Sequence, residues 1–307
     1  MRAVVCKAFK GIEALDFAEI DEPRPAANEV LVDVHAASVS YMDYLMSSGG
    51  YQMRPALPYV PGTDAAGIVL ACGERVTRFR PGDRVSCGNW FGAFAERMVA
   101  KESSVAMLPA NVDFTVGSTV RHTYLTAWYA LIERARLQAG ETVLVTGAAG
   151  GVGLACVEIA HLMGARVIAV VGSAAKAALA RTRGAAEVVD HSCEDVRERV
   201  KALAGSGLDI CADNVGGALF ATLARFMMPS ADSPLAPLTQ DAAWQRHARF
   251  FDSAFGQLEQ RQISKIRAWA DTNLAAPRPT MRPWEFSAFR ALRRIEALPP
   301  SAKRRQL

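Results

Sequence analysis

The segment TVLVTGAAGGVG, residues 142–153, decides the fold of this chain. Its first five residues are β-branched or apolar and predict a buried strand, and the glycine-rich turn after them leads into an apolar stretch that predicts a helix. Such a turn lets backbone N–H groups and the positive end of the helix approach a pyrophosphate, while the last glycine lets the helix pack closely on the strand. The segment therefore predicts a dinucleotide site, whose contact residues we expect to be Ala149, Gly150, Gly151, Val152 and Gly153.

Strands and helices alternate around this turn. We expect helices at residues 124–136, 152–163, 174–183 and 193–203, and strands at residues 142–146, 166–171, 187–189 and 208–212. Repetition of the β-α-β unit predicts an α/β fold with a doubly wound parallel sheet.

The first third of the chain has a different pattern. Short runs that are β-branched or alternate in polarity occur at residues 3–9, 15–20, 30–37, 66–72, 84–87 and 94–99. Many short strands with few helices predict a barrel-like or sandwich domain. We therefore expect a β-rich domain at residues 1–118, a dinucleotide-binding domain at 119–228 and a mostly helical segment at 229–307.

The composition excludes several classes of protein. The 307 residues are 50% hydrophobic and 21% charged, as in an ordinary globular protein, and the net charge is +4. The positive charge is concentrated in residues 276–307, so the rest of the chain offers no basic footprint for nucleic acid. No secretory signal is visible, and no apolar run reaches the ~18 residues that a membrane span needs. The six cysteines are scattered and predict neither a disulfide framework nor a zinc knuckle, so we expect a cytoplasmic protein.

The end of the second strand predicts the cofactor. NAD-preferring sites carry an acid about 20 positions beyond the glycines, which binds the ribose 2′-hydroxyl. Here the strand ends in VVGSAAK, residues 170–176, without an acid. The Ser173 hydroxyl and the Lys176 cation suit a 2′-phosphate instead, which predicts NADP(H). His191, just after the third strand, is a second candidate for the same phosphate, and the alternative is a solvent-exposed loop histidine.

Several motifs occur in the order and spacing of one family. They are VSYMD (39–43), GGY (49–51), LPYVPGTDAAG (57–67), PGDRV (81–85), TA (126–127), AAGGVG (148–153) and DNVGG (213–217). The chain resembles the medium-chain dehydrogenase/reductase superfamily and, within it, the zinc-independent quinone oxidoreductases. The resemblance implies a GroES-like N-terminal domain, a Rossmann domain, and further cofactor contacts at Ser40, Thr126, Asn214 and Val215. Ser40 stands where asparagine is common in the family.

Zinc-dependent relatives place a cysteine, a histidine and a cysteine at positions that correspond here to Ser40, Thr63 and His122. Two hydroxyls and one imidazole are a poor ligand set for tetrahedral zinc. We therefore expect no catalytic metal, and the alternative role of His122 is that of a hydrogen-bonded packing residue.

The resemblance also implies a reaction, in which NADPH reduces a small-molecule quinone or α,β-unsaturated carbonyl. Hydride transfer leaves negative charge on the acceptor, which needs a hydrogen-bond donor or a proton. Tyr51 is the candidate donor, because a tyrosine at this Gly-x-Tyr position supplies the proton in similar enoyl reductases. A tyrosine that only shapes the mouth of the cleft is an equal alternative, since quinones also take protons from water.

The C-terminal third departs from the family pattern. Residues 227–232 stand where relatives have a Gly-Gly-containing strand, and residues 301–305 stand where they have a closing Gly-Lys-x-x-Leu strand. We therefore expect a truncated C-terminal part, a poorly packed segment at residues 227–240 and an impaired homodimer. The alternative function is an NADPH-binding, non-catalytic remnant.

Overall fold

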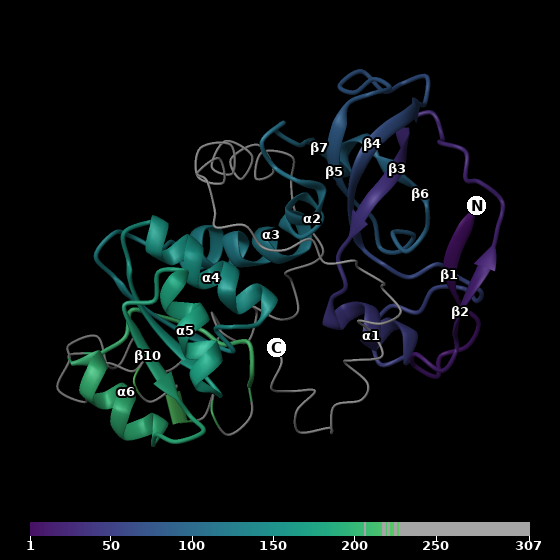
Figure 1. Ribbon diagram of the computed structural model, residues 1–307. Coiled ribbons are helices and arrows are strands. Elements are labelled where there is room, and N and C mark those ends of the chain that lie inside the picture. The colour runs from purple at the N-terminus through teal and green to yellow at the C-terminus, as the bar shows by residue number, and fades with distance from the viewer. Residues whose placement is uncertain (206, 217–218, 220–221, 224–225, 227–307) are drawn as a thin grey trace. The chain divides into compact units, whose positions relative to one another are not determined.

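The computed structural model describes residues 1–205, 207–216, 219, 222, 223 and 226. These residues fall into two compact units, which divide between His122 and Thr123 (Figure 1). The features expected at residues 227–307, including the truncated part and the impaired dimer, lie outside the described residues. Within the described residues, no helix is long and apolar enough to cross a membrane.

The first unit is β-rich, as predicted. Its main sheet is antiparallel with the strand order β6-β3-β4-β5-β7, and β1 pairs separately with β2. The strands are β1 Arg2–Cys6, β2 Leu15–Glu19, β3 Glu29–Ala37, β4 Asp64–Cys72, β5 Arg84–Gly88, β6 Arg97–Lys101 and β7 Val105–Met107. The helices are α1 Tyr41–Ser47, α2 Phe114–Gly117 and the 3₁₀ turn Glu102–Ser104. Apolar side chains from these strands, among them the fully buried Val30, Val32 and Val85, form the core of this unit.

The second unit contains the predicted parallel sheet, with the strand order β10-β9-β8-β11. The strands are β8 Thr142–Thr146, β9 Arg166–Val171, β10 Glu187–Asp190 and β11 Ile210–Ala212. The helices are α3 Leu125–Trp128, α4 Gly151–Leu162, α5 Ala174–Thr182 and α6 Val196–Ala204 (Figure 1). The chain winds from β8 through β9 to β10 and then returns to place β11 on the other side of β8, so the winding reverses beside β8. Ligands of doubly wound folds bind at this reversal point, outside the carboxyl ends of the strands.

The helix expected at residues 124–136 differs from a regular α-helix. A π-helical segment, Val120–Tyr124, precedes α3, and a second one, Tyr129–Arg134, follows it. The N–H of His122 donates to the carboxylate Oδ2 of Asp64 at 2.6 Å. This bond gives a partner to an N–H of the first helical turn, which has no acceptor inside the helix, and a sequence pattern does not reveal such a long-range partner.

Helix α1 was not predicted, because seven residues carry too short a pattern. The helix begins with a capping box, in which the N–H and the hydroxyl of Ser40 both donate to Oδ2 of Asp43 at 2.7 Å. The helix therefore begins at a pair of side chains that also belongs to the candidate site described below.

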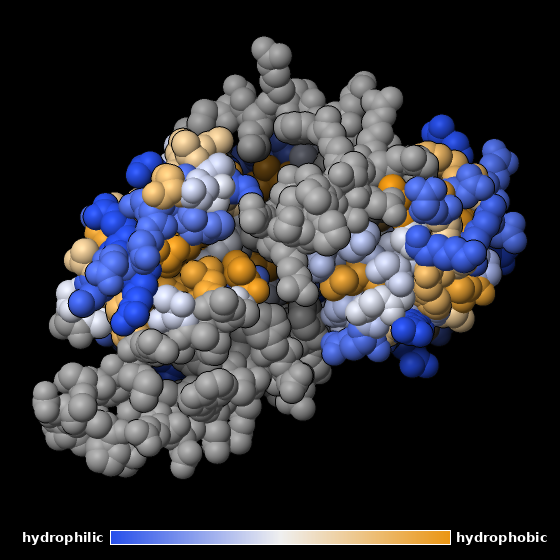
Figure 2. Space-filling model, turned by 90° about the horizontal axis from the view of Figure 1, so that it is seen from below, coloured by the Kyte–Doolittle hydropathy of each residue, from blue (hydrophilic) through white to orange (hydrophobic). Residues whose placement is uncertain are grey.

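Some large hydrophobic side chains of the first unit are exposed. Phe17 is 63% exposed, and Trp90 and Phe91, in the loop after β5, are 40% and 41% exposed. On the face shown in Figure 2, hydrophobic residues of the described parts lie beside hydrophilic ones. Single exposed hydrophobic residues are normal for a protein surface and do not by themselves define a site.

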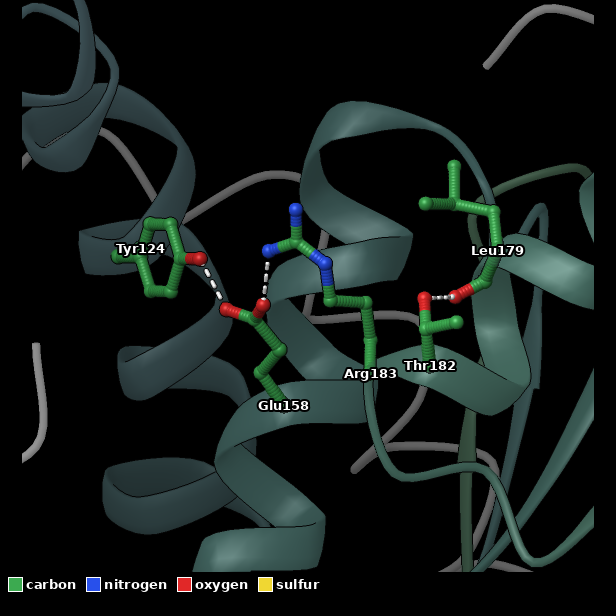
Figure 3. A network of polar contacts seen from close by, with 5 residues as sticks. All are labelled: Tyr124, Glu158, Leu179, Thr182 and Arg183. Atoms are coloured by element: carbon green, nitrogen blue, oxygen red, sulfur yellow. Dashed lines mark hydrogen bonds and ion pairs between the residues drawn. The ribbon is translucent and has the colours of Figure 1, made fainter. Parts of the chain in front are cut away.

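A carboxylate with little exposure joins three helical segments of the second unit. Glu158 of α4 accepts a hydrogen bond from the Tyr124 hydroxyl and forms an ion pair with Arg183, which follows α5 (Figure 3). The side chains of Arg183 and Glu158 are 22% and 9% exposed. In the last turn of α5 the Thr182 hydroxyl donates to the Leu179 carbonyl at 2.7 Å. This network holds α4, whose first residues form the predicted dinucleotide turn, against its neighbours.

Candidate functional site

The predicted dinucleotide turn joins β8 to α4. Gly147 has a φ of 58°, and a Cβ on Gly153 would collide with the Gly147 carbonyl, so both positions require glycine. Leu154 donates the first hydrogen bond of α4, to the Gly150 carbonyl at 2.8 Å. The N–H groups of residues 151–153 therefore have no carbonyl partner inside the helix and are suited to bind an anion.

The individual residues of this turn differ in what they offer a ligand. The Gly150 N–H donates to the Gly147 carbonyl at 2.8 Å, so it serves the turn itself. Gly151 is exposed, and a Cβ there would meet only the Thr123 side chain, at 3.7 Å, so a ligand could approach closely. Ala149 and Val152 are half-buried beside it. Thr126 lies on α3, which packs against α4.

The carboxyl end of β11 is fastened to that of β8. The Asn214 backbone N–H donates to the Thr146 hydroxyl at 2.9 Å, and its side-chain amide donates to the Thr146 carbonyl at 3.0 Å. Asp213 accepts hydrogen bonds from the Thr146 hydroxyl and from the N–H groups of Val215 and Gly216. The fold thus brings Asn214 and Val215 to the turn. Asp213 was not predicted from the sequence as a site residue, although it is a carboxylate directly before the predicted contact residue Asn214.

The candidate 2′-phosphate residues lie together at the turn between β9 and α5. The Ser173 hydroxyl caps α5 and accepts a hydrogen bond from the Lys176 N–H at 3.4 Å. The Lys176 side chain is half-buried, and this burial lowers the pKa of its ammonium group. The exposed His191 donates its N–H to the Val171 carbonyl at 2.9 Å, and its ring lies against Gly172, with Nε2 2.8 Å from where a Cβ would stand.

An acid does lie near this turn, but it is the last residue of β10, the third strand in chain order, and it does not follow β9. The Asp190 carboxylate accepts hydrogen bonds from the N–H and the hydroxyl of Ser192, at 3.0 and 2.7 Å. These bonds hold the pKa of Asp190 below its ordinary value, and they engage the Oδ1 oxygen of this carboxylate.

The three positions that correspond to zinc ligands in relatives meet in the first unit around two buried carboxylates. Asp43 accepts hydrogen bonds from the N–H and the hydroxyl of Ser40, and it lies close enough to Gly62, the residue before Thr63, for that backbone to lower its pKa. Asp64, directly after Thr63, binds the N–H of His122. Neither carboxylate was predicted from the sequence as a site residue, although Asp43 stands inside the motif at residues 39–43 and Asp64 inside the motif at residues 57–67.

Burial dominates the electrostatics of this cluster. It raises the pKa of Asp43 to about 6, against the hydrogen bonds from Ser40, and raises the pKa of Asp64 to about 7, against the His122 N–H. It also lowers the pKa of the His122 imidazole, which is therefore neutral at pH 7. Within the described residues, Asp43 Oδ1 and the Thr63 hydroxyl are buried without a hydrogen-bond partner.

The donors at this place do not fit zinc. In the described part of the chain, no group of three or more histidine, cysteine, aspartate or glutamate side chains is arranged to hold a metal ion. The Ser40 hydroxyl already donates to Asp43, and Thr63 and His122 supply no thiolate.

Tyr51, the candidate proton donor, follows the end of α1. Its backbone N–H donates to the Leu45 carbonyl at 3.2 Å, which fixes the chain as it leaves the helix. Its hydroxyl is buried near the Gln52 side chain and makes no hydrogen bond of normal geometry within the described residues. Burial raises the pKa of this phenol, so it remains protonated at neutral pH.

Comparison with known proteins agrees with this architecture. Residues 26–110 match the alcohol dehydrogenase GroES-like domain, and residues 151–235 match the zinc-binding dehydrogenase family. Quinone oxidoreductase from Rattus norvegicus is 39% identical over 213 residues, which cover 68% of this chain and 65% of that protein. The match therefore spans slightly less than two thirds of the length of this relative.

Two solved structures are similar over most of their length. Quinone oxidoreductase from Pseudomonas syringae pv. Tomato DC3000 has a TM-score of 0.76 and 28% identity, covering 89% of this chain and 88% of its own. Escherichia coli quinone oxidoreductase, complexed with NADPH, has a TM-score of 0.71 and 25% identity, covering 90% of this chain and 98% of its own.

A GroES-like β-rich unit followed by a parallel dinucleotide-binding sheet defines the medium-chain dehydrogenase/reductase superfamily, and the chain belongs to it. Within that superfamily it belongs to the quinone oxidoreductase branch. The family and fold class predicted from the sequence are thereby confirmed.

Proposed function

We propose that this chain is an NADPH-dependent, zinc-free oxidoreductase that transfers a hydride to a small-molecule quinone or α,β-unsaturated carbonyl. The observation that carries the proposal is the turn after β9, where Ser173, Lys176 and His191 gather and where no acid follows the strand. A hydroxyl and a cation suit a 2′-phosphate, and the turn lacks the carboxylate that a ribose 2′-hydroxyl would need. One similar structure is an NADPH complex.

Different residues of the chain bind different parts of the cofactor, whose nicotinamide supplies the hydride when bound. The N–H groups at residues 151–153 bind the pyrophosphate, because they are the open donors of the first turn of α4. Ser173, Lys176 and His191 bind the 2′-phosphate. Asn214 and Val215, held by Thr146 and Asp213, supply further contacts, and the resemblance assigns others to Ser40 and Thr126.

Tyr51 supplies the proton that the acceptor takes up after hydride addition. Its buried hydroxyl lacks a normal hydrogen bond within the described residues and keeps its proton at neutral pH, as a general acid must. The competing role is purely one of shape. A Tyr51→Phe variant distinguishes the two, because it keeps the ring and removes the hydroxyl group that donates the proton.

The proposed setting is the cytoplasm. All six cysteines are free thiols, including the exposed Cys193, which is usual for a reducing compartment.

Steady oxidation of NADPH, followed at 340 nm with 1,4-benzoquinone or an enone as acceptor, tests the function of the purified full chain. Continuous turnover supports the reductase. NADPH binding without turnover supports the second function, a cofactor-binding remnant, which is motivated by the altered residues 227–232 and 301–305. Absence of NADPH binding contradicts both functions.

A further inference from the structure

Arg121 is a cation that neither the predicted site nor the proposed mechanism uses. It lies in the π-helical segment Val120–Tyr124, directly before His122, and its side chain is half-buried. Within the described residues, no hydrogen bond or ion pair involves its guanidinium group, which has five N–H donors. A partly desolvated cation with unused donors is costly unless a ligand satisfies it.

The surroundings hold this cation without neutralising it. Arg121 Nε and Asp64 Oδ1 each lie 3.0 Å from the position that a Cβ on Gly88 would occupy, so the two groups share the space above that glycine. The other carboxylate oxygen of Asp64, Oδ2, accepts a hydrogen bond from the His122 N–H at 2.6 Å. Burial raises the pKa of Asp64 and so disfavours its charged form, while the Arg121 charge acts in the opposite direction.

The guanidinium itself keeps its charge. Burial lowers the pKa of Arg121, while Asp64 and the Cys87 thiol act in the opposite direction. An arginine side chain remains protonated in proteins at any ordinary pH. The result is a fixed positive charge beside a carboxylate that only partly compensates it.

The position of Arg121 connects it to the candidate active site. It is next to His122 in the chain and shares Asp64 with it, and Asp64 follows Thr63, whose buried hydroxyl has no partner in the described residues. Thr63 and His122 stand at positions at which zinc-dependent relatives hold their metal. In this chain a guanidinium is the positive charge at that place.

We propose that Arg121 is a catalytic residue that binds the carbonyl oxygen of the electron-poor acceptor and stabilises the negative charge that forms there. The inference rests on the proposed reductase function. A hydride from a reduced nicotinamide dinucleotide brings an electron pair and forms a new C–H bond on the acceptor. The acceptor's π electrons then move onto its oxygen, a proton from Tyr51 or water completes the reduction, and the oxidised dinucleotide leaves. Arg121 places donors where that charge appears.

An equilibrium measurement with 4-nitrophenol tests the site without any turnover. The phenolate of this probe resembles an enolate, because its negative charge lies on an oxygen conjugated to an electron-poor π system, and only the phenolate absorbs visible light strongly. We expect the full chain to bind phenolate at least about tenfold more tightly than phenol, which lowers the apparent pKa of the bound probe by about one unit.

Variants assign this effect to the guanidinium. Arg121→Met should abolish the preference for phenolate, and Arg121→Lys should retain part of it. Gly88→Ala keeps the arginine but places a Cβ 3.0 Å from Nε, so it should weaken the preference even if Arg121→Met fails to fold. Arg75→Met, in an exposed loop of the same unit, is the matched control and should change nothing.

Kinetics provide the second readout. Arg121→Met should lower kcat for the acceptor by about 100-fold or more and leave the Kd for NADPH unchanged, as expected for loss of an oxyanion donor. Equal phenolate preference in the parent chain and a folded Arg121→Met variant would overturn the proposal, as would the absence of any preference in the parent chain. A chain that binds phenolate through Arg121 but never oxidises NADPH would refute the reductase function and leave the anion site standing.

Discussion

Replacement of Lys176 by alanine should weaken the binding of NADPH much more than the binding of NADH. Lys176 lies in the first turn of α5, whose N-cap is Ser173. The ring of His191 lies against Gly172, directly before that cap. NADPH and NADH differ only in the 2′-phosphate. Removal of a cation that binds this phosphate should weaken NADPH and leave NADH almost unaffected.

The structure sets the size of the effect. A hydrogen bond to a charged group contributes about 1.5 to 3 kcal/mol, which corresponds to about 10- to 150-fold in affinity. Partial burial of Lys176 reduces solvent screening and favours the upper part of that range. The Ser173 hydroxyl and the His191 ring remain in the variant, so the loss is incomplete. We expect the Kd for NADPH to rise about 30-fold and the Kd for NADH to change by less than about twofold.

Fluorescence titration of the reduced nicotinamide measures both constants on the same protein. Arg181→Ala is the matched control, because it removes the same charge from the exposed last turn of α5. Equal weakening of both cofactors by Lys176→Ala, or an equal effect of Arg181→Ala, would refute the assignment of the phosphate to this turn.

Three further predictions concern stability and metal. The pKa of Asp43 rises from 3.8 to about 6 on folding, so the unfolded chain releases this proton at a lower pH than the folded chain does. The free energy of unfolding should therefore fall as the pH increases from about 4 to about 6. In urea titrations, the Asp43→Asn variant should show a flatter dependence of this free energy on pH. Arg183→Met leaves the buried Glu158 carboxylate without its cation and should lower the free energy of unfolding by about 3 kcal/mol, whereas Arg181→Met should not; equal stability of the two variants would contradict a structural role for the pair. A chelator should leave NADPH oxidation unchanged, and stoichiometric zinc in the purified protein would contradict the assignment of Ser40 as a non-ligand.

The local pattern of the sequence was sufficient to predict the dinucleotide turn. Residues 142–153 contain the strand, the turn and the start of the helix as neighbours in the chain, and only glycine fits at Gly147 and Gly153. β8 and β9 have the predicted bounds, because short apolar strands between helices carry strong signals. The resemblance then supplied the order of the two units.

Tertiary structure alone decided how the candidate site of the first unit is arranged. The hydrogen bond from the His122 N–H to the Asp64 carboxylate joins residues 58 positions apart in the chain. No pattern in the sequence distinguishes Arg121 from other arginines or Gly88 from other glycines. The two residues lie close together because of how β4, β5 and the π-helical segment pack. The raised pKa of Asp64 follows from the same packing, because desolvation depends on everything that surrounds a group in space and not on its neighbours in the chain.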